Sequence, residues 1–134
     1  MKSSVAVFIF VSIILISMTI QQNPVKPWPV PDDYKNMTNP VEKGESSNNA
    51  GKALYDKYCA SCHGKTGLGD GVKGRALKDF PGDFSGEYYQ NQTDGEHFYK
   101  TKVGRGEMPK YEDRMSDEDI WNMVNYMRTF KKAD

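Results

Sequence analysis

The sequence predicts an all-α domain in which about three to four helices are joined by long loops. Apolar residues recur at helical spacing in two segments, near residues 50–59 and 120–130. The connection after the first segment is glycine-rich over residues 64–71, and no strand-rich pattern surrounds the two cysteines. The 134 residues are enough for one modest domain preceded by a leader.

The first helix is expected from Ala50 to Cys59, where alanine, leucine and tyrosine side chains recur at helical spacing. Gly51 costs such a helix up to about 1 kcal/mol relative to alanine, so its presence indicates that another helix approaches closely here. Tyr55, one turn further along, is expected to lie beside this contact.

The most regular helix is expected after Ser116, whose hydroxyl can accept a hydrogen bond from an unpaired backbone N–H at the helix start. Acidic residues 117–119 favour the positive end of the helix dipole. We expect this helix to pack against Gly51 through an apolar face formed by Ile120, Met123, Val124, Met127 and Phe130. A shorter helix is expected to begin at Thr93, which forms a capping box with Glu96.

Cys59, Cys62 and His63 form the pattern C-x-x-C-H, the attachment sequence for a c-type haem. Two thiols at this spacing can reach both vinyl groups of the porphyrin from one short helical turn, and the next residue presents an imidazole to the iron. Haem attachment uses both cysteines of the chain. A buried haem also supplies an apolar plate to a chain in which only 37% of the residues are hydrophobic.

The two cysteines allow three other interpretations. A thioredoxin-like redox pair favours a βαβ setting, which the surrounding pattern does not indicate. A zinc site would need both cysteines together with His63 and His97, and the adjacent Cys62 and His63 are cramped for tetrahedral coordination. A Cys59–Cys62 disulfide would close too small a loop to stabilise the fold much.

The sixth iron ligand is expected to be Met108, one of seven methionines. Gly104 and Gly106 let the backbone come close to the haem, and Pro109 biases Met108 toward an extended conformation. Met115, directly before the last helix, is expected to be a hydrophobic staple. The remaining methionines are assigned to the leader, the tether or the last helix: Met1, Met18, Met37, Met123 and Met127.

The segment from about Gly51 to Phe130 resembles a class I cytochrome c. The matching elements are Gly51, Tyr55, Cys59, Cys62, His63, the glycine-rich stretch through Gly71, Gly104-x-x-x-Met108-Pro109 and Tyr126. The resemblance implies a cytochrome c fold wrapped around one covalently bound haem c. It assigns attachment and axial ligation to Cys59, Cys62, His63 and Met108, and the expected haem-pocket residues are Leu77, Phe84 and Tyr111.

The chain departs from the family at the residue that orients the histidine ligand. The family often has a Gly-Pro pair after the haem motif, and the proline carbonyl accepts a hydrogen bond from the histidine. Here Val72 follows Gly71, and the next proline is Pro81. We therefore expect some backbone carbonyl in residues 71–81 to orient His63.

Residues 1–21 are expected to be a signal peptide or an uncleaved membrane anchor, because Lys2 is followed by an apolar run from Val5 to Ile20. Residues 22–49 contain five prolines and are expected to form an extended tether to a mono-haem domain at 50–134. The resemblance implies an exported protein. It would be periplasmic, either soluble or anchored to the inner membrane.

The chain has 18 basic and 18 acidic residues, which argues against a nucleic-acid binder. With His63 and Met108 on the iron, no site stays open for a substrate, so the expected function is one-electron transfer between redox partner proteins in a bacterial respiratory chain, not catalysis. One alternative is the haem c subunit of a larger membrane-bound oxidoreductase complex. Another is a haem enzyme or gas sensor in which Met108 leaves the iron.

Overall fold

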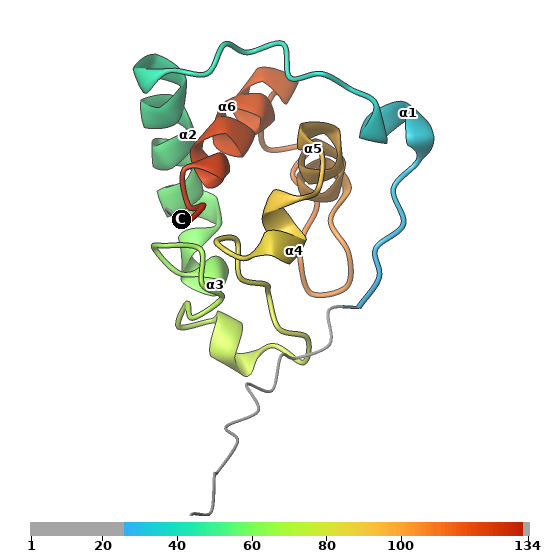
Figure 1. Cartoon of the computed structure of the whole chain (residues 1–134). Helices are drawn as coiled ribbons and strands as arrows, with labels where there is room; N and C mark the ends of the chain where they lie inside the picture. The colour runs from blue at the N-terminus through green and yellow to red at the C-terminus, as the bar shows by residue number, and fades with distance from the viewer. Residues whose placement is uncertain (1–25, 133–134) are drawn as a thin grey trace, which may run out of the picture.

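The computed structural model describes residues 26–132, which form six α-helices and one short 3₁₀ helix, with no β-strand in this range. The helices are α1 (Asp32–Lys35), α2 (Glu45–Tyr58), α3 (Ala60–His63), α4 (Glu87–Gln90), α5 (Asp94–Val103) and α6 (Asp117–Arg128), with η1 (Gly74–Ala76) between α3 and α4. The predicted all-α class is confirmed: α2, α5 and α6 are the longer helices, and long loops follow α1, α3, η1 and α5 (Figure 1).

Helices α2 and α6 lie side by side and make the most extensive helix–helix contact of the described fold (Figure 1). Gly51 is buried at their crossing, where a Cβ atom would lie only 2.7 Å from the carbonyl carbon of Asn122 and 2.8 Å from Cβ of Tyr126. The Tyr55 ring packs edge-on against Tyr126, with ring centroids 5.5 Å apart. The close approach expected at Gly51 is therefore confirmed.

Helix α2 begins at Glu45, five residues before the expected start at Ala50. The extra turn contains Ser47, a buried residue whose hydroxyl accepts a hydrogen bond of 2.8 Å from the Asn125 amide in α6. This tertiary contact stabilises a turn that has few apolar side chains of its own.

Both predicted capping boxes are present. The Ser116 hydroxyl accepts from the Asp119 N–H at 3.1 Å, and the Asp119 carboxylate accepts from the Ser116 N–H at 3.0 Å. Thr93 and Glu96 form the same reciprocal pair at the start of α5. The N-terminal ends of α5 and α6 are therefore determined by side chains within one helical turn of the N-cap residue.

The segment before α2 packs against the rest of the fold and does not form the extended tether expected there. Val30 is buried, and the ring of Tyr34 in α1 lies 4.7 Å from the ring of Tyr99 in α5. Asn39 donates to the Asn125 side chain at 2.8 Å. The aromatic packing of Tyr34 and the hydrogen bond of Asn39 outweigh the preference of the prolines in this segment for an extended conformation.

The N-terminal leader lies outside the described residues. Between residues 26 and 132, no helix combines the length and the apolar character that a membrane span needs.

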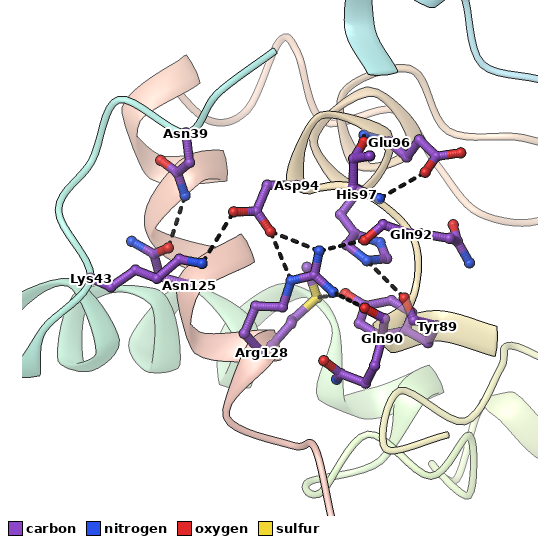
Figure 2. A network of polar contacts seen from close by, with 12 residues as sticks. Asn39, Lys43, Tyr89, Gln90, Gln92, Asp94, Glu96, His97, Asn125 and Arg128 are labelled. Carbon is purple, nitrogen blue, oxygen red and sulfur yellow. Dashed lines mark hydrogen bonds and ion pairs between the residues drawn. The ribbon is translucent and has the colours of Figure 1, made fainter. Parts of the chain in front are cut away.

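Arg128 joins the end of α6 to the segment between α4 and α5 (Figure 2). Its guanidinium donates to the Asp94 carboxylate at 2.7 Å and to the carbonyls of Gln90 and Gln92 at 2.9 and 2.6 Å. Burial alone would raise the pKa of Asp94, but its hydrogen bonds and charge interaction with Arg128 hold this pKa below the ordinary value. The network fixes α4 and α5 relative to α6, which matters because all three helices contribute residues to the cavity described below.

We predict that Gly51→Ala destabilises the protein by about 1–3 kcal/mol, as overpacking in a well-packed core does. Alanine adds up to about 1 kcal/mol of helix propensity, but the new methyl group meets backbone atoms of Asn122 that cannot rotate away. Urea unfolding followed by circular dichroism measures the difference. Ala53→Ser, on the exposed side of the same helix, is the control and should change stability by less than about 0.5 kcal/mol. Equal stability of wild type and Gly51→Ala would contradict a tight α2–α6 contact.

Candidate haem-binding site

One cavity of about 850 Å³ brings together every residue that the sequence assigned to the site. Its lining includes Cys59, Cys62, His63, Leu77, Phe84, Met108 and Tyr111. These residues come from the end of α2, from α3, and from two loops, one between η1 and α4 and the other between α5 and α6. A local motif and a distant methionine therefore face a common space.

The two cysteines lie on a turn that starts where α2 ends. The Cys59 carbonyl accepts hydrogen bonds from the N–H groups of Cys62 and His63 at 3.0 and 2.9 Å, which brings the motif into α3. Cys59 is buried and Cys62 is partly exposed. Gly71 and Gly74 pass so close to the Cys62 carbonyl that a side chain at either position would overlap it. The loop after α3 therefore wraps tightly around the motif.

His63 has a ring that stacks on Phe84, with centroids 4.5 Å apart. Its Nδ1 atom is buried without a hydrogen-bond partner. Burial lowers the pKa of His63 to about 4, and the carbonyl of Pro81 acts in the opposite direction without reaching hydrogen-bonding geometry. The imidazole is therefore neutral, which is the form that binds iron. Pro81 lies at the end of the range expected to supply the orienting carbonyl.

Met108 is half-buried at the cavity wall and ends a tight turn. Its backbone exchanges two hydrogen bonds with Arg105, at 2.9 and 3.0 Å. Gly104, with φ of +63°, lies against this turn, since a Cβ there would be 2.5 Å from the Met108 carbonyl oxygen. The glycines thus allow the loop to fold back on itself and carry Met108 to the cavity.

The methionines of the core and of α6 have contacts of their own, although Met123 and Met127 also line the cavity. Met115 is buried in the core beside α6 and does not line the cavity, as expected of a staple residue. The sulfur of Met123 lies 3.4 Å from Sγ of Cys59, and the sulfur of Met127 accepts from the Tyr89 hydroxyl at 3.4 Å. Within residues 26–132, Met108 is therefore the cavity-lining methionine outside the packed face of α6.

Two cavity residues, Tyr89 and His97, were not assigned to the pocket by the sequence. Their rings stack at 3.9 Å, and Tyr89 stacks in turn on Phe84 at 4.3 Å. His97 is buried, and its Nε2 lies 3.1 Å from the Tyr89 carbonyl oxygen. In the sequence, His97 was considered only as a possible zinc ligand, and Tyr89 was not singled out. Phe84 and Tyr89 thus separate His97 from His63 in one continuous stack.

The zinc alternative lacks a geometric basis in residues 26–132, because no group of three or more cysteine, histidine or acidic residues there could hold a metal ion. The residues do fit a haem. The cavity has mainly apolar walls, and both thiols of the chain line it together with a neutral imidazole whose Nδ1 is already buried. A thioether is available from the Met108 loop.

A helical fold with a C-x-x-C-H turn at such a cavity defines a c-type cytochrome domain. Residues 46–127 match the family Cytochrome C oxidase, cbb3-type, subunit III, and the chain belongs to this family. No curated protein matches the chain significantly in sequence.

Two solved structures share the fold. The c-type cytochrome KustC0563 is 26% identical, with a TM-score of 0.54, and the match covers 61% of this chain and 98% of that chain. A chain of the Kuenenia stuttgartiensis reducing HAO-like protein complex Kustc0457/Kustc0458 is 23% identical, with a TM-score of 0.64. That match covers 81% of this chain and 52% of the other chain, so our chain spans about half of it. The predicted cytochrome c fold is thereby confirmed.

We predict that His97 makes the fold less stable in acid. Burial and the nearby charges of Arg128 and Lys100 lower the pKa of His97 to about 3, whereas an unfolded histidine has a pKa near 6.5. Between these values the unfolded chain binds more protons, so the free energy of unfolding should fall by about 1.4 kcal/mol per pH unit as the pH drops below about 6. This contribution is fully present above pH 6.5.

Denaturant unfolding of wild type and His97→Gln between pH 7 and 4 measures this effect. Glutamine can keep the hydrogen bond to the Tyr89 carbonyl but does not titrate, so the difference between the two profiles isolates His97 from other acid-sensitive groups. Parallel profiles across this range would contradict the prediction.

Proposed function

We propose that this chain carries single electrons by means of one haem c, bound through thioethers to Cys59 and Cys62 and ligated by His63 and Met108. The observation that carries the proposal is the convergence of these four side chains on one cavity. The proposed setting is a bacterial respiratory chain, and the family membership of the chain supports it. Electron transfer, rather than catalysis, would be the task of the domain.

When bound, the haem supplies a reversible one-electron iron couple. The chain's own residues would tune this couple and protect it. Met108 offers a thioether, a weak donor that favours ferrous iron and raises the reduction potential. Phe84, Leu77 and Tyr111 line the cavity with mainly apolar surface and reduce the access of water. None of these residues needs to gain or lose a proton during electron transfer.

The location and partners belong to the same proposal. We propose that residues 1–21 export the protein, so that it works in the periplasm, either free or held at the inner membrane by an uncleaved segment. Its partners would be a donor and an acceptor protein that dock near the haem.

A second candidate function is that of a haem c subunit in a larger oxidoreductase complex. The name of the family, subunit III of an oxidase, favours it, and so does the likeness to a chain of a multi-protein complex. Mild detergent solubilisation of membranes from the native host, followed by native electrophoresis and haem staining, separates the two. Migration of the haem at the size of the single chain supports a carrier, free or anchored, whereas migration in a larger assembly supports a subunit of a complex.

We predict that Met108→Ala abolishes the weak far-red absorption band that marks methionine ligation of ferric haem. The iron should become high-spin and the ferrous form should bind CO readily, because no side chain then occupies the sixth position. Visible spectra before and after reduction, with and without CO, test this. Met115→Leu is the matched control, since it changes a buried methionine outside the cavity and should keep the band.

A wild-type protein that is already high-spin, or that binds CO at neutral pH as readily as Met108→Ala, would overturn the assignment of Met108. Either result would favour the alternative function considered from the sequence, a haem enzyme or gas sensor in which Met108 leaves the iron.

A further inference from the structure

The N-terminal residues of the described chain bind the loop that carries Met108. We call residues 26–30 the strap. The guanidinium of Arg105 donates to the carbonyls of Pro27 and Lys26 at 2.6 and 3.3 Å. It also lies over the ring of Trp28, 4.3 Å from the ring centroid. The Arg105 side chain of the Met108 loop therefore binds two backbone carbonyls and the face of one aromatic ring in the strap.

Arg105 is directly linked to Met108. The two residues begin and end the same four-residue turn and exchange both of their backbone hydrogen bonds. Gly106, with φ of +59°, allows the turn to be this tight. A movement of Met108 away from the cavity would therefore carry Arg105 with it and break its contacts with the strap.

The strap is a fixed anchor because its last residue and the helix that follows it are packed. Val30 is buried, and Tyr34 in α1 stacks against Phe98 and Tyr99 of α5. The backbones of α1 and α5 approach so closely that a side chain at Gly95 would overlap the Tyr34 carbonyl. A second contact holds the Met108 loop, because the Glu107 carboxylate accepts a hydrogen bond of 2.8 Å from the backbone N–H of Lys78 in the loop after η1.

Trp28 belongs to the cavity as well as to the strap. It lines the cavity together with Arg105 and Met108 and is partly buried. The family match covers residues 46–127, so the strap lies outside the matched segment.

We propose that Arg105 and Trp28 are positioning residues that hold the Met108 loop closed and thereby restrain the sixth iron ligand. The inference rests on the proposed ligation of the iron by Met108. An external ligand can reach the iron only if Met108 leaves, and this opening costs the contacts between Arg105 and the strap. The strap therefore lowers the affinity of the iron for external ligands.

Imidazole binding to the ferric holoprotein measures the restraint, with loss of the far-red band as the signal. Arg105→Gln should bind imidazole about tenfold more tightly than wild type, which corresponds to about 1.4 kcal/mol. This is the size expected for charge-assisted hydrogen bonds near the surface, where solvent weakens each of them. Trp28→Ala should give a smaller increase in the same direction, because the hydrogen bonds of Arg105 to the strap carbonyls remain.

Three further variants separate positioning from other effects. Arg105→Lys keeps the positive charge but loses the planar fork that binds two carbonyls, so it should behave like Arg105→Gln. Arg75→Gln removes an equal charge from an exposed position that does not line the cavity, and it should behave like wild type. The double variant of Trp28→Ala and Arg105→Gln should exceed Arg105→Gln alone by little, because Arg105→Gln already removes the contact with the Trp28 ring.

The outcomes distinguish this inference from the proposed function. A wild-type protein without the far-red band would overturn both. A wild-type protein with the band, and an unchanged imidazole affinity in Arg105→Gln and Trp28→Ala, would overturn the strap alone. If Arg105→Lys bound imidazole as weakly as wild type, the charge of Arg105 alone would explain its effect, and the proposal that Arg105 positions the Met108 loop would be overturned. Thermal unfolding by circular dichroism checks that each variant is folded, and Trp28→Phe should restore most of the wild-type affinity.

Discussion

The contact of α2 with α6 at Gly51 determines where the other parts of the site can lie. Because Gly51 has no side chain, the backbone of α2 reaches the backbone of α6 at Asn122. Cys59 follows directly at the end of α2, and Met123 of α6 lies against its sulfur. The crossing therefore fixes one end of the cavity, and α3, which carries Cys62 and His63, continues from that fixed point.

The α4–α5 side of the cavity depends on polar anchors in addition to aromatic packing. Arg128 holds the α4–α5 connection through a carboxylate and two carbonyls, and Tyr89 and His97 on that side stack toward Phe84 and His63. The combination of packed helices with hydrogen-bonded connections suits a small chain with few hydrophobic residues. The packed helices provide rigidity, and hydrogen-bonded loops shape the volume that a large planar cofactor would fill.

The packed segment between residues 26 and 44 changes how the N-terminal region is understood. A free tether would leave the domain able to rotate about its attachment point. Here Tyr34, Asn39 and the strap bind α5, α6 and the Met108 loop, so the chain enters the domain at a defined place. If residues 1–21 anchor the protein, this entry point orients the haem side of the domain relative to the membrane.

The sequence alone predicted the features whose determinants lie within a few residues of one another. The C-x-x-C-H turn, the capping boxes at Thr93 and Ser116, and the flexibility needed around Gly104 are of this kind. Gly51 was informative for a related reason, since a glycine inside a helix signals close approach even though it does not name the partner.

The tertiary structure decided the features that join distant segments. The start of α2 at Glu45 depends on Asn125, and the course of residues 26–44 depends on side chains of α5 and α6. The pairing of Arg105 with Pro27 joins residues that are 78 positions apart. Periodicity and capping report on local backbone preference, whereas these contacts arise only after the helices have packed and brought the partners within reach, so no local pattern could encode them.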